Sequence, residues 1–154
     1  MDRKAVILSD RINHASILDG IFIGKGENIK VAIKRYNHND MDDLERILEV
    51  LDPELPKMII TDGVFSMEGD IVKLDRMVEI AKKYNTRLYV DDAHGLGVLG
   101  EGGRGTLEHF NLFDDVDLVT ATFSKSFASL GGVIAGKKEV IDYIKHHSRA
   151  LIFC

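Results

Sequence analysis

An apolar run passes directly into two acids and a histidine in the segment Arg87-Leu88-Tyr89-Val90-Asp91-Asp92-Ala93-His94-Gly95. Leu88, Tyr89 and Val90 are residues typical of a buried strand. A carboxylate that follows such a strand loses hydration, so it is stable as an anion only beside a cation. The segment therefore predicts a strand whose carboxyl end, at Asp91, faces a positive group. The alternative is an ordinary surface acid at the end of a strand.

Similar short apolar runs lie on both sides of this strand, at residues 5–8, 31–33, 58–60, 118–120 and 133–135. Residues 41–51 and 73–84 repeat apolar side chains at helical spacing, and a third helix is expected over residues 138–148. Strands buried on both faces that alternate with helices predict an α/β domain with an open, mostly parallel sheet and helices on both faces. The last strand could run antiparallel. We expect residues 1–154 to form a single domain.

Composition narrows the class of ligand. The chain has 154 residues, of which 45% are hydrophobic, and a net charge of −5. An acidic chain gives no electrostatic reason to bind nucleic acid or a membrane surface, so we expect a small-molecule ligand. A lone cysteine, Cys154, and the lack of a long apolar run favour the cytoplasm. The apolar end of the chain, residues 150–154, suggests a piece of a longer protein.

Polar clusters follow four of the predicted strands: Ser9-Asp10 with His14, Asp62 with Ser66, Asp91 to His94, and Thr122 to Lys125. Each cluster alone is equally typical of turns and helix caps. In a parallel sheet, however, the carboxyl ends of the strands meet at one edge, where ligands bind. A lysine at the floor of such a crevice loses hydration, which favours the neutral amine that attacks aldehydes. The uncharged residues around Lys125 fit this role.

The glycines of Gly95-Leu96-Gly97-Val98-Leu99-Gly100 match the dinucleotide fingerprint G-x-G-x-x-G. In a nucleotide-binding fold this loop opens directly into a helix. Here further glycines extend the loop, and Asp91 to His94 separate it from the strand. We therefore reject a nicotinamide or flavin site, and we expect no metal.

Four separated motifs together resemble the α-oxoamine synthase family: Ser9 to Ser16, Thr61 to Asp70, Val90 to Gly95 with Gly97 to Gly100, and Thr122 to Lys125. The resemblance covers essentially the whole chain. It implies the central part of the large domain of a fold type I (aspartate aminotransferase-like) enzyme that depends on pyridoxal 5′-phosphate (PLP). Members of this family are acyltransferases that join an amino acid to an acyl-CoA, and the resemblance implies a homodimer.

The resemblance also implies which residues contact PLP. Lys125 would hold it as a Schiff base and move the Cα proton, and Asp91 would pair with the pyridine nitrogen. His94 would hydrogen-bond oxygen during the condensation. The implied catalytic residues are Lys125 and His94, and the implied cofactor-binding residues are His14, Ser66, Asp91, His94, Thr122 and Lys125.

For substrates we expect glycine with acetyl-CoA first, as in 2-amino-3-ketobutyrate CoA ligase. The alternatives are alanine with pimeloyl-CoA, as in 8-amino-7-oxononanoate synthase, a longer acyl donor with serine, another fold type I aminotransferase, or a non-catalytic fragment. Complete family members are much longer, with a further phosphate-binding loop and a carboxylate-binding arginine. We therefore expect the 154-residue chain to be inactive in acyl transfer by itself.

Overall fold

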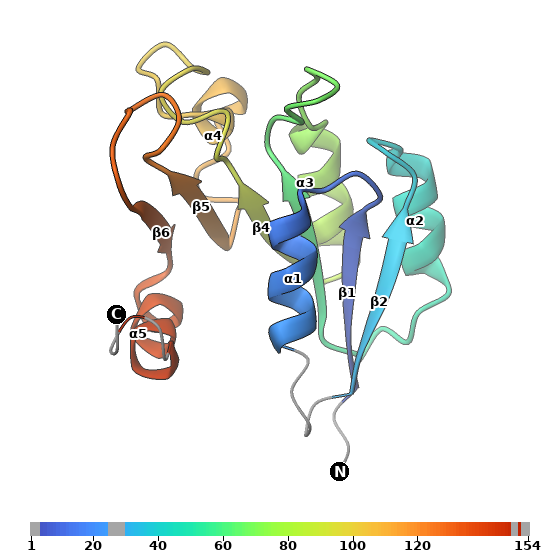
Figure 1. The fold of residues 1–154 in the computed structure, drawn as a ribbon. Helices are drawn as coiled ribbons and strands as arrows, with labels where there is room; N and C mark the ends of the chain where they lie inside the picture. Colours follow the sequence, from blue (N-terminus) through green and yellow to red (C-terminus); the bar gives the residue numbers. More distant parts are fainter. Residues whose placement is uncertain (1–3, 25–29, 149–150, 152–154) are drawn as a thin grey trace.

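Six strands form one mixed sheet in the computed structural model, which describes residues 4–24, 30–148 and 151 (Figure 1). The strands are β1 (Lys4–Asp10), β2 (Lys30–Tyr36), β3 (Lys57–Asp62), β4 (Arg87–Asp91), β5 (Leu118–Thr122) and β6 (Gly132–Gly136). Their order is β2-β1-β3-β4-β5-β6; β1 to β5 run parallel, and β6 runs antiparallel to β5. The predicted open, mostly parallel sheet is confirmed, as is the antiparallel direction left open for the last strand. Cys154 lies outside the described residues.

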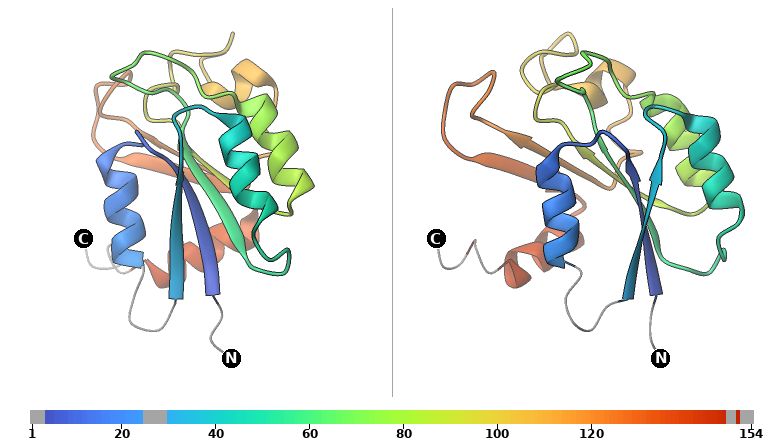
Figure 2. Two further views of the ribbon diagram at one scale, coloured as in Figure 1. Left: turned by 90° about the vertical axis from the view of Figure 1, so that its right-hand side faces the viewer. Right: turned by 45° about the vertical axis from the view of Figure 1, so that its right-hand side comes forward.

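Helices cover both faces of this sheet, as predicted. One face carries α1 (Ala15–Gly24), and the other carries α2 (Met41–Glu49) and α3 (Leu74–Lys83), as the left view of Figure 2 shows. The short α4 (Thr106–Phe110) lies near the carboxyl ends of the strands, and α5 (Lys138–His147) follows β6. None of the helices in these residues is long and apolar enough to cross a membrane.

The main hydrophobic core lies between the sheet and the α2–α3 pair. The carboxylate of Asp40 begins α2 by accepting a hydrogen bond from the Asp43 amide at 3.0 Å, an N-cap that satisfies a helix-end donor. The apolar faces of both helices then bury against β1, β3 and β4. The largest fully buried apolar side chains are Leu8, Tyr36, Leu44, Leu48, Ile59, Phe65, Leu74, Met77 and Leu88.

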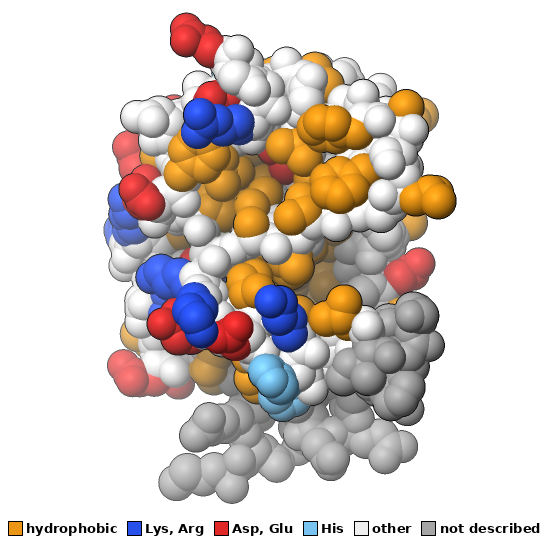
Figure 3. Space-filling model, turned by 90° about the vertical axis from the view of Figure 1, so that its left-hand side faces the viewer, with side chains coloured by type: hydrophobic (Ala, Val, Ile, Leu, Met, Phe, Trp, Pro, Cys, Tyr) orange, Lys and Arg blue, Asp and Glu red, His pale blue; other side chains and the backbone are white. Residues whose placement is uncertain are grey.

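The β6 edge of the sheet differs from the sequence prediction of strands buried on both faces. All five residues of β6 are exposed, and none of the side chains of α5 is buried. The β-branched residues of β6 therefore remain in contact with solvent in the described part of the chain. Figure 3 shows hydrophobic side chains gathered on the side of the molecule that carries β6. The exposed large apolar side chains of β6 and of the loop before it are Phe127, Leu130, Val133 and Ile134.

Candidate functional site

The polar clusters predicted to meet at the strand ends do meet there. Loops that follow β1, β3, β4 and β5 surround a cavity of about 520 Å³ at the carboxyl edge of the sheet. Every residue that the sequence assigned to the site contributes to its lining: His14, Ser66, Asp91, His94, Thr122 and Lys125. These residues are spread over more than 100 positions of sequence, from 14 to 125, and the parallel register of the strands brings them together.

Two acids lie side by side at the floor of the cavity. Asp62 and Asp91 are register partners in β3 and β4, and Thr120 of β5 pairs with Asp91 in the same way. Asp62 is only 5% exposed. Burial, the largest cause, and the charge of Asp91 raise the pKa of Asp62, whereas the hydrogen bond from the His14 amide and the charge of Lys125 lower it; the net result is a pKa of about 6. This pair of carboxylates favours a cationic ligand group.

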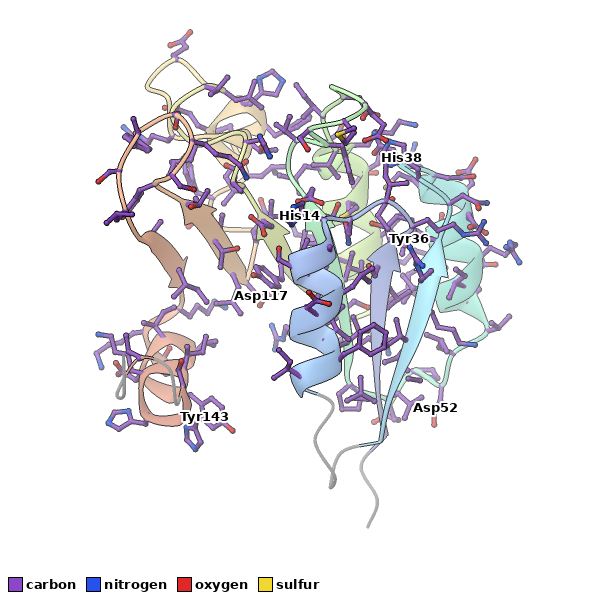
Figure 4. All side chains as sticks on the ribbon, in the orientation of Figure 1. His14, Tyr36, His38, Asp52, Asp117 and Tyr143 are labelled. Carbon is purple, nitrogen blue, oxygen red and sulfur yellow. The ribbon has the colours of Figure 1, made fainter. Side chains whose placement is uncertain are left out.

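The loop after β1 is held against this acid pair. The buried side chain of Asn13 donates to the Ile60 carbonyl at 2.8 Å and accepts from the Asp62 amide at 3.0 Å. The next residue, His14, donates its backbone N–H to Asp62 Oδ2 at 2.7 Å. The His14 ring remains exposed at the start of α1 (Figure 4), with Nδ1 2.8 Å from the hydroxyl of Ser16. The ring is thus oriented at the cavity wall but not buried.

Asp92 organises the loop that carries His94. Its carboxylate, 2% exposed, accepts from the Thr106 amide at 2.8 Å and from the Thr106 hydroxyl at 2.5 Å. A Cβ on Gly95 or Gly105 would lie 2.1 or 1.9 Å from this carboxylate, so both positions require glycine. Burial lowers the pKa of His94, as do the charges of Lys125 and His14, while Asp91 opposes them. The His94 ring is therefore mainly neutral at pH 7, able to donate or accept one hydrogen bond.

The glycine run 95–100 does not open into a helix, because α4 begins only at Thr106. It contacts the lysine-bearing loop instead: Ser126 donates its hydroxyl to the Leu96 carbonyl at 2.6 Å. Gly97 has a φ of +81°, and a Cβ there would lie 2.5 Å from Ser126 Oγ. The rejection of a nucleotide fingerprint agrees with this geometry. These glycines allow a close approach between two loops.

Lys125 lines the cavity but is exposed, which corrects the expectation of a desolvated lysine on its floor. It follows β5 in a turn where the Ala128 amide donates to the Lys125 carbonyl at 3.0 Å. Solvent therefore reaches the side chain of Lys125 in the described part of the chain. Nearby, the hydroxyls of Thr122 and Ser124 lie 2.8 Å apart and form a small polar pair.

The donor set in the cavity fits PLP. A carboxylate pair suits a protonated ring nitrogen, a primary amine suits the aldehyde, and the Thr122–Ser124 hydroxyl pair suits a phosphate. Two histidines complete the lining. In the described ranges no three His, Cys, Asp or Glu side chains are grouped so that they could hold a metal ion.

Asp62 is the site residue to which sequence reasoning assigned no role. It was one of the polar residues at a strand end, but only Ser66, four positions later, was assigned to the site. The signal was available: Asp62 directly ends its strand, as Asp91 does, so parallel pairing places the two acids next to each other. Asn13 was also missed, because its role depends on contacts with a distant strand.

Comparisons with known proteins bear on the family, the fold and the cofactor. The family model described as aminotransferase class I and II matches residues 1–154. A serine palmitoyltransferase of Sphingobacterium spiritivorum is 55% identical over 99% of this chain and 37% of that protein. An 8-amino-7-oxononanoate synthase of Thermoanaerobacter pseudethanolicus is 51% identical over 99% of this chain and 38% of that protein. A solved serine palmitoyltransferase from S. paucimobilis, with a bound PLP–myriocin aldimine, has a TM-score of 0.87 at 35% identity and covers 97% of this chain and 38% of that one.

The chain thus spans about 37% of the length of the curated relatives it matches. The solved serine palmitoyltransferase is 35% identical to this chain, so the likeness rests on sequence as well as on fold. The chain belongs to the aminotransferase class I and II family, and within it to the α-oxoamine synthases.

Proposed function

We propose that this protein is a PLP-dependent acyltransferase that condenses a small amino acid with an acyl-CoA. The observation that carries the proposal is the meeting of six separately predicted residues in one cavity at the carboxyl edge of the sheet. Family membership and the PLP-bound relative support the cofactor. Because the chain spans about 37% of its relatives' length, the activity belongs to the whole protein and is proposed as such.

The family resemblance gives each residue a proposed role, and the chemistry of each side chain is compatible with it. When bound, PLP withdraws electrons from the amino acid's Cα, which eases loss of a substituent there. The amine of Lys125 would hold the cofactor and move the Cα proton, and the charge of Asp91 would keep the ring nitrogen protonated. Neutral His94 hydrogen-bonds oxygen during acyl transfer. From the same resemblance, His14 would stack on the cofactor ring, Ser66 would contact its phenolic oxygen and Thr122 would contact its phosphate.

For the substrates, the names of the relatives favour a revision of our first expectation. The two curated relatives described above are a serine palmitoyltransferase and an 8-amino-7-oxononanoate synthase. Serine with a long-chain acyl-CoA is therefore our first proposal, and alanine with pimeloyl-CoA is the second. Glycine with acetyl-CoA, expected from the sequence, becomes the third. We also propose that the whole protein acts as a homodimer.

Cofactor trapping tests the proposal at a single atom. The purified chain is mixed with PLP, reduced with borohydride, digested and analysed by mass spectrometry. We expect the label on Lys125 and its loss in Lys125→Ala, whereas the exposed Lys137 serves as the matched control through Lys137→Ala. Labelling that persists in Lys125→Ala, or that lies mainly on Lys137, would contradict the assignment.

Turnover separates the substrate classes. Thiol release is followed with serine and palmitoyl-CoA, alanine and pimeloyl-CoA, and glycine and acetyl-CoA; a keto acid without CoA tests for an aminotransferase. We expect no turnover by the 154-residue chain, because the Thr122–Ser124 pair supplies few of the charge-assisted bonds that a phosphate dianion needs, each contributing roughly 1.5–3 kcal/mol. Robust turnover that depends on Lys125 would overturn this expectation.

A further inference from the structure

A histidine outside the cavity joins two carboxylates from distant parts of the chain. His38 follows β2 and lies above the carboxyl ends of β1 and β2 (Figure 4). Its Nδ1 lies 3.2 and 3.3 Å from the two carboxylate oxygens of Asp10, at the end of β1. Its Nε2 lies 3.0 and 3.3 Å from those of Asp70, in the loop between β3 and α3. Both ring nitrogens of one imidazole thus face an acid.

This arrangement depends on the charge of the ring. A neutral imidazole carries one N–H and can donate to one carboxylate, and its other nitrogen then turns a lone pair toward the second acid. An imidazolium donates to both. Asp10 is 1% exposed, so this carboxylate has little solvent to replace a lost donor. The geometry is therefore satisfied in full only when His38 is protonated.

The groups around the His38 ring favour its protonated form. Burial lowers the pKa of His38, but its hydrogen bonds to Asp10 and Asp70 and their charges outweigh burial, so the pKa lies above the ordinary value of 6.5. From the loop after β3 the ring meets the uncharged edge of Phe65, with centroids 4.5 Å apart. From β2, burial and the charge of Asp10 raise the pKa of Tyr36, which stays a neutral phenol. Both ionised partners are thus acids.

The first partner anchors the loop that leads to His14. One oxygen of Asp10 accepts from the Ile12 amide at 2.9 Å, and the other accepts from the Asn39 amide at 2.8 Å. Ile12 itself lines the cavity. Movement of the Asp10 carboxylate would therefore be transmitted through a single residue to the cavity wall.

The second partner anchors the loop that carries Ser66. The Asp70 carbonyl accepts from the Phe65 amide at 3.0 Å, and the Phe65 side chain both meets the His38 ring and lines the cavity. Asn39 supports the same loop by donating to the Ile71 carbonyl at 3.0 Å. His38 and Asn39 together tie the 65–72 loop to the end of β1.

We propose that His38, protonated and donating to Asp10 and Asp70 at once, is a positioning residue that holds together the loops bearing His14 and Ser66. His38 does not line the cavity itself; it acts through Ile12 and Phe65, which do. We call this pair of contacts, from His38 to Asp10 and to Asp70, the clamp. The clamp is complete below the ordinary pKa of histidine. It is lost as pH rises through the raised pKa of His38, because the neutral ring can donate to only one of the two acids. Cofactor binding should then weaken with it, an effect that rests on the proposed function.

The first test measures the protonation state of His38 directly. In the chain labelled with ¹⁵N in its histidines, NMR should find both His38 nitrogens protonated at pH 6, and Asp70→Asn should lower the midpoint of its titration because one carboxylate is gone. The exposed His109 is the control whose midpoint should not move. A singly protonated His38 ring at pH 6, or a midpoint that Asp70→Asn leaves in place, would overturn the proposal.

The second test measures how firmly the two loops are held. It uses amide hydrogen exchange, with the rates corrected for their intrinsic dependence on pH. His38→Gln should speed exchange at Ile12, Asn39 and Phe65 by roughly ten- to a hundredfold, the loss expected for one charged hydrogen bond, and it should abolish the fall in protection that the unmutated chain shows as pH rises. His109→Gln should change neither. Unchanged exchange at these amides in His38→Gln would refute the clamp.

PLP titration of the same variants tests whether the clamp affects cofactor binding in the cavity. Below pH 7, His38→Gln should bind PLP more weakly than His109→Gln. Above pH 7, His109→Gln and the unmutated chain should lose further affinity as the clamp is lost, whereas His38→Gln should not. If the unmutated chain binds no PLP, the proposed function fails while the exchange result still decides the clamp. If PLP affinity is equal in both variants but the exchange differs, His38 holds the loops without positioning the site, and the proposal is rejected.

Discussion

The buried carboxylate of Asp62 should make the stability of the chain fall as pH rises. Its folded pKa of about 6 lies above the model-compound value of 3.8, mainly because burial disfavours the charge. The folded state therefore holds this proton more tightly than the unfolded state does. The stabilisation is fully present below pH 3.8 and is lost as pH rises through about 6, and the difference corresponds to about 3 kcal/mol in the free energy of unfolding.

Asp62→Asn removes this titration while retaining the shape of the side chain and an oxygen for the His14 amide. The free energy of unfolding is measured by urea denaturation at pH 4 and pH 7.5 for both proteins. Between these values the unmutated chain should lose up to about 3 kcal/mol relative to Asp62→Asn, whatever constant offset the substitution adds. The exposed Asp19 of α1 gives the matched control, and Asp19→Asn should follow the unmutated chain. Parallel pH profiles for the Asp62→Asn and unmutated chains would refute the reasoning.

Two further substitutions test the loops around the cavity. Burial and the charge of Lys125 lower the pKa of His94, so Lys125→Met should raise it toward the ordinary value; an NMR titration in which the midpoint stays or falls would contradict this. Gly97→Ala should destabilise the chain by roughly 1–3 kcal/mol in urea, since its φ is +81° and the new Cβ would lie 2.5 Å from Ser126 Oγ. A variant as stable as the unmutated chain would show that the two loops separate freely.

The strands and the amphipathic helices could be predicted because their patterns are local. Residues 73–84 repeat apolar positions at helical spacing, and α3 occupies Leu74–Lys83. The helix α1 was missed although Ile17 and Ile21 are four residues apart and both are buried. Its two glycines and the weak segregation of its apolar residues hide that spacing. The five-residue α4 depends on Asp92, a tertiary contact that no local pattern encodes.

The members of the site could be predicted, but their burial could not. Parallel strands bring their carboxyl ends to one edge, so Asp91 and Lys125 were expected to face one cavity, and they do. Whether a lysine there is desolvated depends on what covers the loop after β5. In the described residues nothing does so, and Lys125 is exposed. The role of His38 was equally hidden, because it requires two acids separated from it by 28 and 32 positions.

A common construction underlies the cavity, in which a residue at a strand end is fixed by its neighbour in the chain. Asp91 and Asp92 lie at the end of β4, where successive side chains of an extended strand point in opposite directions, whereas the other two pairs lie in the loops after β1 and β5. Asn13 bonds to β3, Asp92 to Thr106 and Ser126 to the Leu96 carbonyl. The cavity-lining neighbours are, in the same order, His14, Asp91 and Lys125. The three neighbours carry no proposed chemistry, yet they fix where it can occur, because each bond crosses to a different segment. Their loss should therefore displace a lining residue without removing its functional group.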